Sequence, residues 1–304
     1  MSSTVKQAVS ELSVPVPWGE IRGKVWGPDH GRPVLCLHGW ADNCGTFSTL
    51  IPLLPRECRY VAVDFPGHGQ SSHRPPGVFY AFPAYVADVR RVVEALQWTK
   101  FSIIGHSMGD ALYPEMVDVV VLLDAFGFVP TAPKEIFKVM RQGMDELLQF
   151  EQKAEQTQRV YTYEKAVERL LAANPTLSLQ SVHILLERGL AQVEGASLNV
   201  NFILCFQKNI ARTTLEQCLE MQKKIQARFL VILINSDVFL IQCVSLPLSL
   251  SLSLRQHTVV TVPGDHHVHL NNPEVVAPLV SDFLQRTHTF SFTEQFISSG
   301  YVTV

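Results

Sequence analysis

The pattern that most constrains this chain of 304 residues is the pentapeptide Gly-His-Ser-Met-Gly at residues 105–109. It follows directly on an apolar run at 101–104. A serine in such a pattern lies on a sharp turn from strand to helix, where the flanking glycines avoid a steric clash and the hydroxyl projects outward. The pattern predicts Ser107 as a nucleophile. Because chance alone gives a Gly-x-Ser-x-Gly match in about one chain in ten of this length, the surrounding sequence has to support it.

Two further apolar runs precede the serine. Residues 33–37 run into His38-Gly39-Trp40, and residues 60–64 run into a turn at 65–71. Both runs are apolar on both faces, which is typical of parallel strands covered on two sides. Helical patterns at 47–54 and 86–96 separate the three runs. This order predicts an α/β fold with a mostly parallel central sheet flanked by helices.

A histidine-rich turn lies near the other end of the chain. Residues 258–262 have a strand pattern and run into residues 263–270, which contain three histidines, and Pro273 then opens a helix. A histidine in the turn after the last strand can serve as a general base. The chain order serine, acid, histidine is the order of the α/β-hydrolase triad.

The chain resembles the α/β-hydrolases and, within them, the animal serine hydrolase-like proteins. The resemblance rests on Val-Leu-Cys-Leu-His-Gly-Trp at 34–40, Pro-Glu-Met-Val-Asp at 114–118 and the turn at 266–273. It is good over residues 12–125 and 255–290 and loose between them. It implies an esterase-type serine hydrolase that cleaves a small or medium carboxylic ester, thioester or amide through a Ser-His-Asp triad and an acyl-enzyme.

The resemblance also assigns the base. Counting back from Pro273, the family's spacing of turn, base and helix favours His266. His267 and His269 are then expected to be packing or surface groups.

Two carboxylates compete for the role of triad acid. Asp124 ends the apolar run at 119–123, and Asp237 follows the apolar run at 231–234. The end of that later strand is the commoner location across the fold, but the resemblance extends through Asp124 and fades around Asp237. Asp124 is therefore favoured and Asp237 is the alternative, although an Asp at a strand end can instead cap a helix.

The oxyanion of a tetrahedral intermediate needs backbone N–H donors. The N–H of Met108 directly follows the nucleophile. The N–H of Trp40 is the second candidate, because Gly39 lets its loop approach the serine closely. The predicted oxyanion hole therefore consists of Trp40 and Met108.

The segment behind the nucleophile is short. Only residues 110–113 separate Gly109 from Pro114. In the proteins that this chain resembles, the helix after the nucleophile continues for about two more turns before that proline. Roughly seven residues are missing, which corresponds to about 10 Å of helix at a rise of about 1.5 Å per residue. The alternative to an active enzyme is therefore an impaired or inactive hydrolase-fold binding protein, or a truncated isoform.

The sequence also predicts how the chain is divided into a core and an insertion. Residues 1–128 and 223–304 are predicted to form the hydrolase core, and residues 129–222, with helical periodicities and few strand signals, a helical cap or lid insertion. Residues 242–255 form a low-complexity Leu/Ser insert that alternates like a strand.

Composition restricts the partners and the compartment. With a net charge of −3 and no basic stripe, nucleic acid is not an expected partner. Six scattered cysteines without a Cys-x-x-Cys pair favour reduced thiols in the cytoplasm. The first residues have no signal-peptide pattern and the last three are not a peroxisomal tripeptide. Membrane association is not favoured, because Asp237 and Pro247 interrupt the apolar stretch at 229–254. The expected partner is a small ester-type molecule.

No cofactor is implied, because the sequence has no phosphate loop and no dinucleotide fingerprint. A metal site is also not expected. The clustered histidines are neighbours in one loop, and no second group of ligands stands beside them in the sequence.

Overall fold

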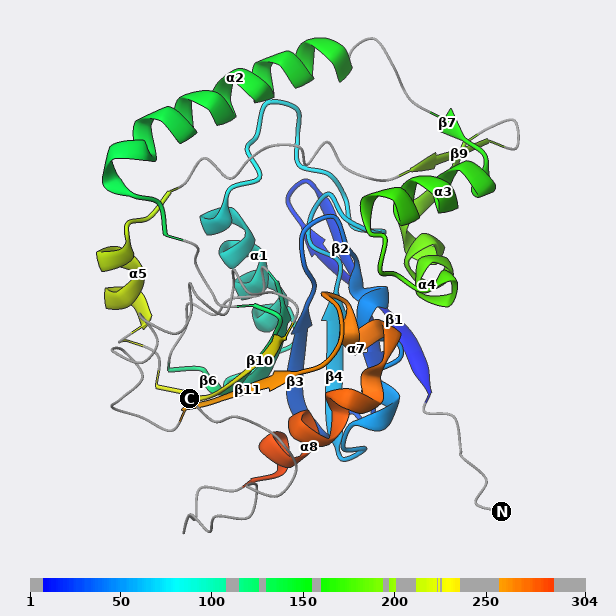
Figure 1. The fold of residues 1–304 in the computed structure, drawn as a ribbon. Coiled ribbons are helices and arrows are strands. Elements are labelled where there is room, and N and C mark those ends of the chain that lie inside the picture. The colour runs from blue at the N-terminus through cyan, green and yellow to red at the C-terminus, as the bar shows by residue number, and fades with distance from the viewer. Residues whose placement is uncertain are drawn as a thin grey trace.

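The computed structural model describes residues 8–107, 115–125, 130–154, 160–193, 197–200, 212–222, 224, 226–235 and 257–286. Its centre is a sheet of eight strands in the order β1-β2-β4-β3-β5-β6-β10-β11 (Figure 1). The strands are β1 Val9–Val16, β2 Gly19–Trp26, β3 Arg32–Leu37, β4 Cys58–Val63, β5 Phe101–His106, β6 Val117–Leu123, β10 Arg228–Ile234 and β11 His257–Val262.

The sheet is mostly parallel, as the sequence predicts. Strands β4, β3, β5, β6, β10 and β11 pair in parallel, and β1 and β2 add an antiparallel hairpin at one edge. The chain runs from β3 to β4 on one side and then returns to β5 on the other. The carboxyl ends of β3 and β5 therefore meet at a point where the strand order reverses, which is where open α/β sheets bind ligands.

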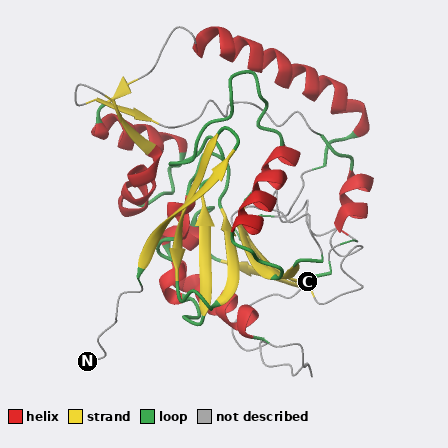
Figure 2. Cartoon of the chain, turned by 180° about the vertical axis from the view of Figure 1, so that it is seen from behind, coloured by secondary structure: helices red, strands yellow, loops and turns green. Residues whose placement is uncertain are grey.

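Helices cover both faces of the sheet (Figure 2). Helix α1 (Phe82–Ala95) packs in the cluster on one face, and α8 (Ala277–Gln285) packs in the cluster on the other. The prediction of a single helix over 47–54 is wrong in detail. Two short 3₁₀ helices lie there instead, η1 (Cys44–Phe47) and η2 (Ile51–Leu53). Pro52 is the second residue of η2 and has no N–H with which to extend an α-helical ladder.

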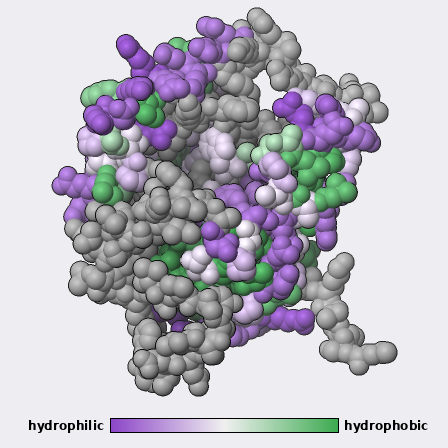
Figure 3. All heavy atoms as spheres, viewed as in Figure 1, coloured by the Kyte–Doolittle hydropathy of each residue, from purple (hydrophilic) through white to green (hydrophobic). Residues whose placement is uncertain are grey.

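Residues 130–222 contain more than helices. The helices are η3 Pro133–Glu135, α2 Ile136–Ala154, α3 Tyr163–Ala173, α4 Leu179–Gly189 and α5 Leu215–Gln222. A small antiparallel sheet of β7 (Val160–Tyr161), β9 (Ser197–Val200) and β8 (Leu190–Val193) accompanies them, which the helical periodicity did not predict. In Figure 1, α2, α3 and α4 lie on the side toward which β3 and β4 point, and Figure 3 shows that hydrophilic residues predominate over α2.

The apolar stretch at 229–254 begins as strand β10 rather than as a helix, and its residues from 236 onward lie outside the described part. Within the described residues, no helix combines the length and the apolar composition that crossing a bilayer requires. The Leu/Ser run at 242–255 also lies outside the described residues.

The hairpin of α3 and α4 is tied to the sheet by buried polar contacts. The side chain of Asn43 donates to the carbonyl of Leu185 at 2.9 Å. Arg188, whose side chain is 2% exposed, donates from Nε to Asp64 at the end of β4 (2.9 Å) and from Nη1 to Glu11 of β1 (2.9 and 3.0 Å). These contacts hold α4 in a fixed position over the loops that follow β3 and β4.

We expect Arg188→Met to lower the free energy of unfolding by about 3–5 kcal/mol, because it leaves the Asp64 carboxylate buried without its ion pair. Arg90→Met is the matched control. Arg90 pairs with Glu94 on the exposed side of α1, so its loss is expected to cost less than about 1 kcal/mol. Chemical denaturation followed by circular dichroism measures both variants. Equal losses of unfolding free energy in the two variants would show that the buried ion pair stabilises the fold no more than an exposed one.

Candidate active site

Ser107 directly follows β5 in the middle of the sheet. Its φ is +57°, a left-handed conformation that side chains other than glycine rarely adopt. Its backbone N–H donates to the carbonyl of Leu123, the last residue of β6, at 3.3 Å. The strained turn expected from the Gly-x-Ser-x-Gly pattern is therefore present at the carboxyl end of the sheet.

The loop after β3 lies against this serine. A Cβ atom added to Gly39 would lie 3.0 Å from the Cβ of Ser107 and 3.0 Å from Nδ1 of His106, so a side chain here would crowd both residues and glycine favours this close approach. Trp40, one of the two predicted oxyanion donors, is the next residue in the loop. Met108, the other donor, lies outside the described residues, as do residues 109–114 of the short segment behind the nucleophile.

His266 is paired with a carboxylate. Its Nδ1 donates to Oδ2 of Asp124 at 2.6 Å. The Asp124 carboxylate is buried, and its Oδ1 accepts a hydrogen bond from the backbone N–H of Ile234 at 3.2 Å. Strand β10 therefore fixes the carboxylate, and the carboxylate fixes the imidazole. Asp237, the alternative acid, lies outside the described residues.

His266 also lies beside the turn that carries Ser107. The ring centroids of His106 and His266 are 4.6 Å apart, and Nε2 of His106 donates to the backbone carbonyl of His266 at 2.9 Å. The imidazole of His266 is 44% exposed, so a substrate can reach it. The structure thus brings the expected base and the favoured acid to the same edge of the sheet as the expected nucleophile.

Backbone strain is concentrated at this edge. Of the four described non-glycine residues with positive φ, three are Ser107, Asp124 (+44°) and Ala41 (+57°), the last in the loop after β3. Each such conformation costs on the order of 1–3 kcal/mol and persists where the surrounding structure requires it. This clustering is typical of a functional site.

A second group of polar side chains lies close to His266. One of its members, Asp42, was not singled out from the sequence. Asp42, in the loop after β3, places Oδ2 at 3.6 Å from Nδ1 of His106 and at 3.9 Å from Nε2 of His267. His267 and His269 are buried, so they pack inside the protein rather than at its surface. The available signal for Asp42 was an acidic residue two positions after the Gly39-Trp40 pair.

Burial and neighbouring charges set the ionisation of this group. Burial raises the pKa of Asp42, but the imidazoles of His106, His267 and His38 outweigh it and lower that pKa to about 2. Burial lowers the pKa of His267 to about 4 and also depresses the pKa of His269. At neutral pH, Asp42 is therefore ionised and both imidazoles are neutral.

Neutral His68 joins the loops after β3 and β4. Its Nδ1 donates to the carbonyl of Pro66 at 3.3 Å, and its Nε2 accepts from the N–H of Ala41 at 3.3 Å. Protonation would add a proton to Nε2 and abolish the second bond. Burial lowers the pKa of His68 from 6.5 to about 3, in agreement with that arrangement.

We expect His68 to make the fold sensitive to acid. Because its pKa is lower in the folded than in the unfolded chain, stability falls as pH decreases from about 6.5 toward about 3. Between pH 7.5 and pH 4.5 this group alone is expected to remove about 2–3 kcal/mol from the free energy of unfolding. Urea denaturation at the two pH values measures the loss. His68→Gln, which does not titrate, is expected to show a smaller loss, and an unchanged loss would contradict this assignment.

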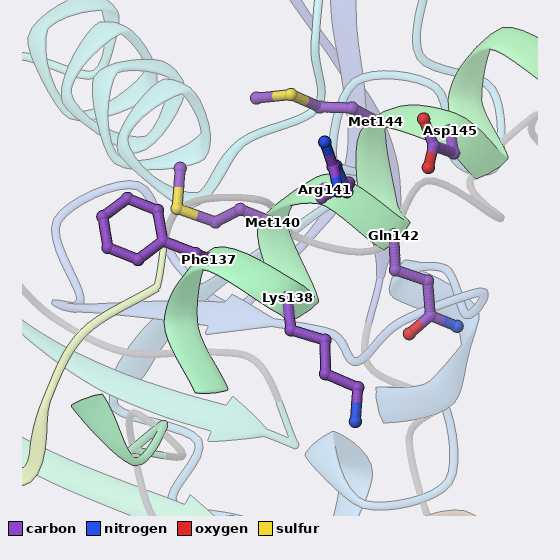
Figure 4. A pocket seen from close by; sticks show the side chains of 7 residues that line it. All are labelled: Phe137, Lys138, Met140, Arg141, Gln142, Met144 and Asp145. Atoms are coloured by element: carbon purple, nitrogen blue, oxygen red, sulfur yellow. The ribbon is translucent and has the colours of Figure 1, made fainter. Parts of the chain in front are cut away.

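An open hollow of about 730 Å³ runs along α2 (Figure 4). In Figure 4, Phe137, Met140 and Met144 lie to one side of the helix, and Lys138 and Gln142 lie to the other. Phe137 is 85% exposed. Farther along the same helix, Leu147 is buried and Leu148 is exposed.

Comparison with known proteins identifies a matching family and close relatives. The model of the alpha/beta hydrolase fold family matches residues 32–273. The chain is 54% identical to a serine hydrolase-like protein of Danio rerio, over 93% of this chain and 91% of that protein. It is 40% identical to serine hydrolase-like protein 2 of Homo sapiens, over 92% of this chain and 95% of that protein.

Solved structures have the same architecture. A hypothetical protein from Pseudomonas aeruginosa superposes with a TM-score of 0.78 at 28% identity, over 91% of this chain and 99% of that chain. The thioesterase domain from the curacin biosynthetic pathway superposes with a TM-score of 0.74 at 22% identity, over 90% of this chain and 99% of that domain. At that identity, the second match reports the fold alone.

Proposed function

Because this chain belongs to the alpha/beta hydrolase fold family, with serine hydrolase-like proteins among its relatives, we propose that it is a serine hydrolase of small or medium carboxylic esters, thioesters or amides. The observation that carries the proposal is the strained turn of Ser107 at the edge of the sheet where Asp124 holds His266 by a 2.6 Å hydrogen bond. These are the parts that nucleophilic acyl transfer requires.

In this mechanism, the hydroxyl of Ser107 attacks the substrate carbonyl and gives its proton to Nε2 of His266. The carboxylate of Asp124 stabilises the resulting imidazolium through its hydrogen bond to Nδ1. The N–H groups of Trp40 and Met108 stabilise the oxyanion. His266 then protonates the departing alcohol, thiol or amine, and an acyl-enzyme remains on Ser107. Water, deprotonated by His266, releases the acid and restores the serine.

A second candidate is a hydrolase fold without efficient catalysis. Residues 107–116 are all that connect the parallel neighbours β5 and β6. Such a crossover usually takes about a dozen residues or more, most often with a helix whose N-terminus faces the oxyanion. A shortened support could displace Ser107, and an error of about 1 Å can lower the rate roughly 10²-fold. A binding protein or a truncated isoform would have these features.

We also infer a cytoplasmic location from the chemistry of the cysteines. Cys36, Cys44, Cys58 and Cys218, the described ones, are all buried free thiols. Burial raises the pKa of Cys36 and of Cys44, which keeps these thiols protonated and unreactive. A reducing compartment is the usual setting for such cysteines.

Covalent labelling with a fluorophosphonate probe separates the two candidates. The probe phosphonylates a serine only where a base activates it. We expect a folded, monodisperse sample to be labelled with one group per chain and to lose labelling after heat denaturation. A folded sample that remains unlabelled under conditions that saturate a known serine esterase would favour the non-catalytic protein.

A further inference from the structure

The group formed by Asp42, His106 and His267, here called the buried triad of ligands, has no role in the proposed reaction. The three side chains are 3%, 1% and 9% exposed. Asp42 Oδ2, His106 Nδ1 and His267 Nε2 all lie within 4.8 Å of one another. The residues come from three separate segments, the loop after β3, the end of β5 and the turn after β11.

Two of these atoms lack the partners that burial demands. Asp42 Oδ2 and His106 Nδ1 are fully buried, and neither has a hydrogen-bond partner among the described residues. Their separation of 3.6 Å is too long for a hydrogen bond between them. A buried polar group left in this state costs about 1–3 kcal/mol, and more when it is charged. A bound cation would satisfy both atoms.

The protonation of His106 agrees with this role. Its Nε2 lies 2.9 Å from the carbonyl oxygen of His266, which can only accept a hydrogen bond. Nε2 therefore carries the hydrogen, and in the neutral ring Nδ1 presents a lone pair toward Asp42 and His267. Metal-binding histidines usually donate their other ring N–H to a carbonyl or carboxylate in this manner.

The donor set and its spacing suit one class of ion. Zinc is bound by imidazole nitrogen and carboxylate oxygen at about 2.0–2.2 Å, so neighbouring tetrahedral ligands lie about 3.4 Å apart. The observed separations of 3.6 and 3.9 Å from Asp42 Oδ2 are about 0.2 and 0.5 Å longer than that value, so binding requires the three side chains to move slightly together. Two nitrogen donors do not suit magnesium or calcium, which prefer oxygen.

We propose that the buried triad of ligands binds one Zn²⁺ ion, or another divalent ion of similar preference, and that the bound ion inhibits hydrolysis. Three protein ligands leave a fourth position for water. The ion would draw in His267, which is joined by a peptide bond to His266, and His106, which holds the backbone of His266. The base would therefore shift relative to Ser107. The inhibitory part rests on the proposed hydrolase function, whereas the binding part does not.

Binding is tested first, on the metal-free full chain at neutral pH. Titration calorimetry with Zn²⁺ is expected to give one ion per chain, and Co²⁺ is expected to give the visible absorption bands of a low-symmetry site with nitrogen ligands. His267→Gln and Asp42→Asn are each expected to weaken binding at least about tenfold. His30→Gln, which alters an exposed histidine between β2 and β3, is the matched control and is expected to bind as the parent does.

Circular dichroism checks the fold of each variant. His267 lies nearest the surface of the three, so His267→Gln decides the result if Asp42→Asn does not fold. Absence of binding to the parent chain, or equal binding by parent and His267→Gln, would overturn the site.

Inhibition is tested separately with an ester substrate. Zn²⁺ is expected to inhibit the parent reversibly, with activity restored by a chelator, and to inhibit His267→Gln only at least about tenfold higher concentration. Binding without inhibition of an active enzyme would overturn the inhibitory role. Binding to a chain with no hydrolytic activity would support the metal site and count against the proposed function alone.

Discussion

Ser107→Ala is expected to abolish both ester hydrolysis and fluorophosphonate labelling. Removing the nucleophile of a serine triad lowers kcat by about 10⁴- to 10⁶-fold, because no other group can form the acyl-enzyme. Alanine removes only the hydroxyl, so the turn after β5 is retained. Turnover of a chromogenic short-chain ester by purified protein measures the effect.

Ser102→Ala is the matched control for this experiment. Ser102 lies earlier on the same strand, β5, and its loss removes the same atom from the interior of the sheet. We expect this variant to keep its labelling and its turnover within a few-fold of the parent. Turnover that survived in Ser107→Ala would assign the chemistry to another residue.

Asp124→Asn is expected to lower kcat/KM by on the order of 10⁴-fold. The amide is nearly isosteric, and its oxygen can still accept the hydrogen bond from Ile234. It cannot, however, stabilise the imidazolium of His266, and its N–H₂ group favours the wrong tautomer of that ring. Single-turnover acylation by a fluorophosphonate probe reports this step directly.

Asp237→Asn is the comparison that decides between the two acids. We expect it to change acylation by no more than a few-fold, because Asp124 already contacts His266 at 2.6 Å. The reverse result, with a large loss in Asp237→Asn and little change in Asp124→Asn, would assign the acid to the alternative position. Equal large losses would indicate that both carboxylates support the base.

Much of the fold could be predicted from local patterns. Six strands of the large sheet were recognisable as apolar runs, since a parallel strand buried on both faces has few polar positions. The hairpin of β1 and β2 was not recognised. It lies at the sheet edge, and its strands carry polar residues at alternate positions, so they lack the continuous apolar run that marks the buried strands. The three short strands β7, β8 and β9 were missed for a similar reason, because two to four residues give too little periodicity to detect.

The sequence by itself determined the order of the parallel strands' segments and the tight turn that carries Ser107, because each is written in a few consecutive residues. The choice of His266 and Asp124 came from the resemblance to the serine hydrolase-like proteins. Only the tertiary structure decided which distant groups meet. Arg188 reaches Asp64, and Asp42 reaches His106 and His267, across separations that no local pattern encodes. Strand order in a parallel sheet brings loop ends together at one edge, and that convergence is a property of the assembled sheet.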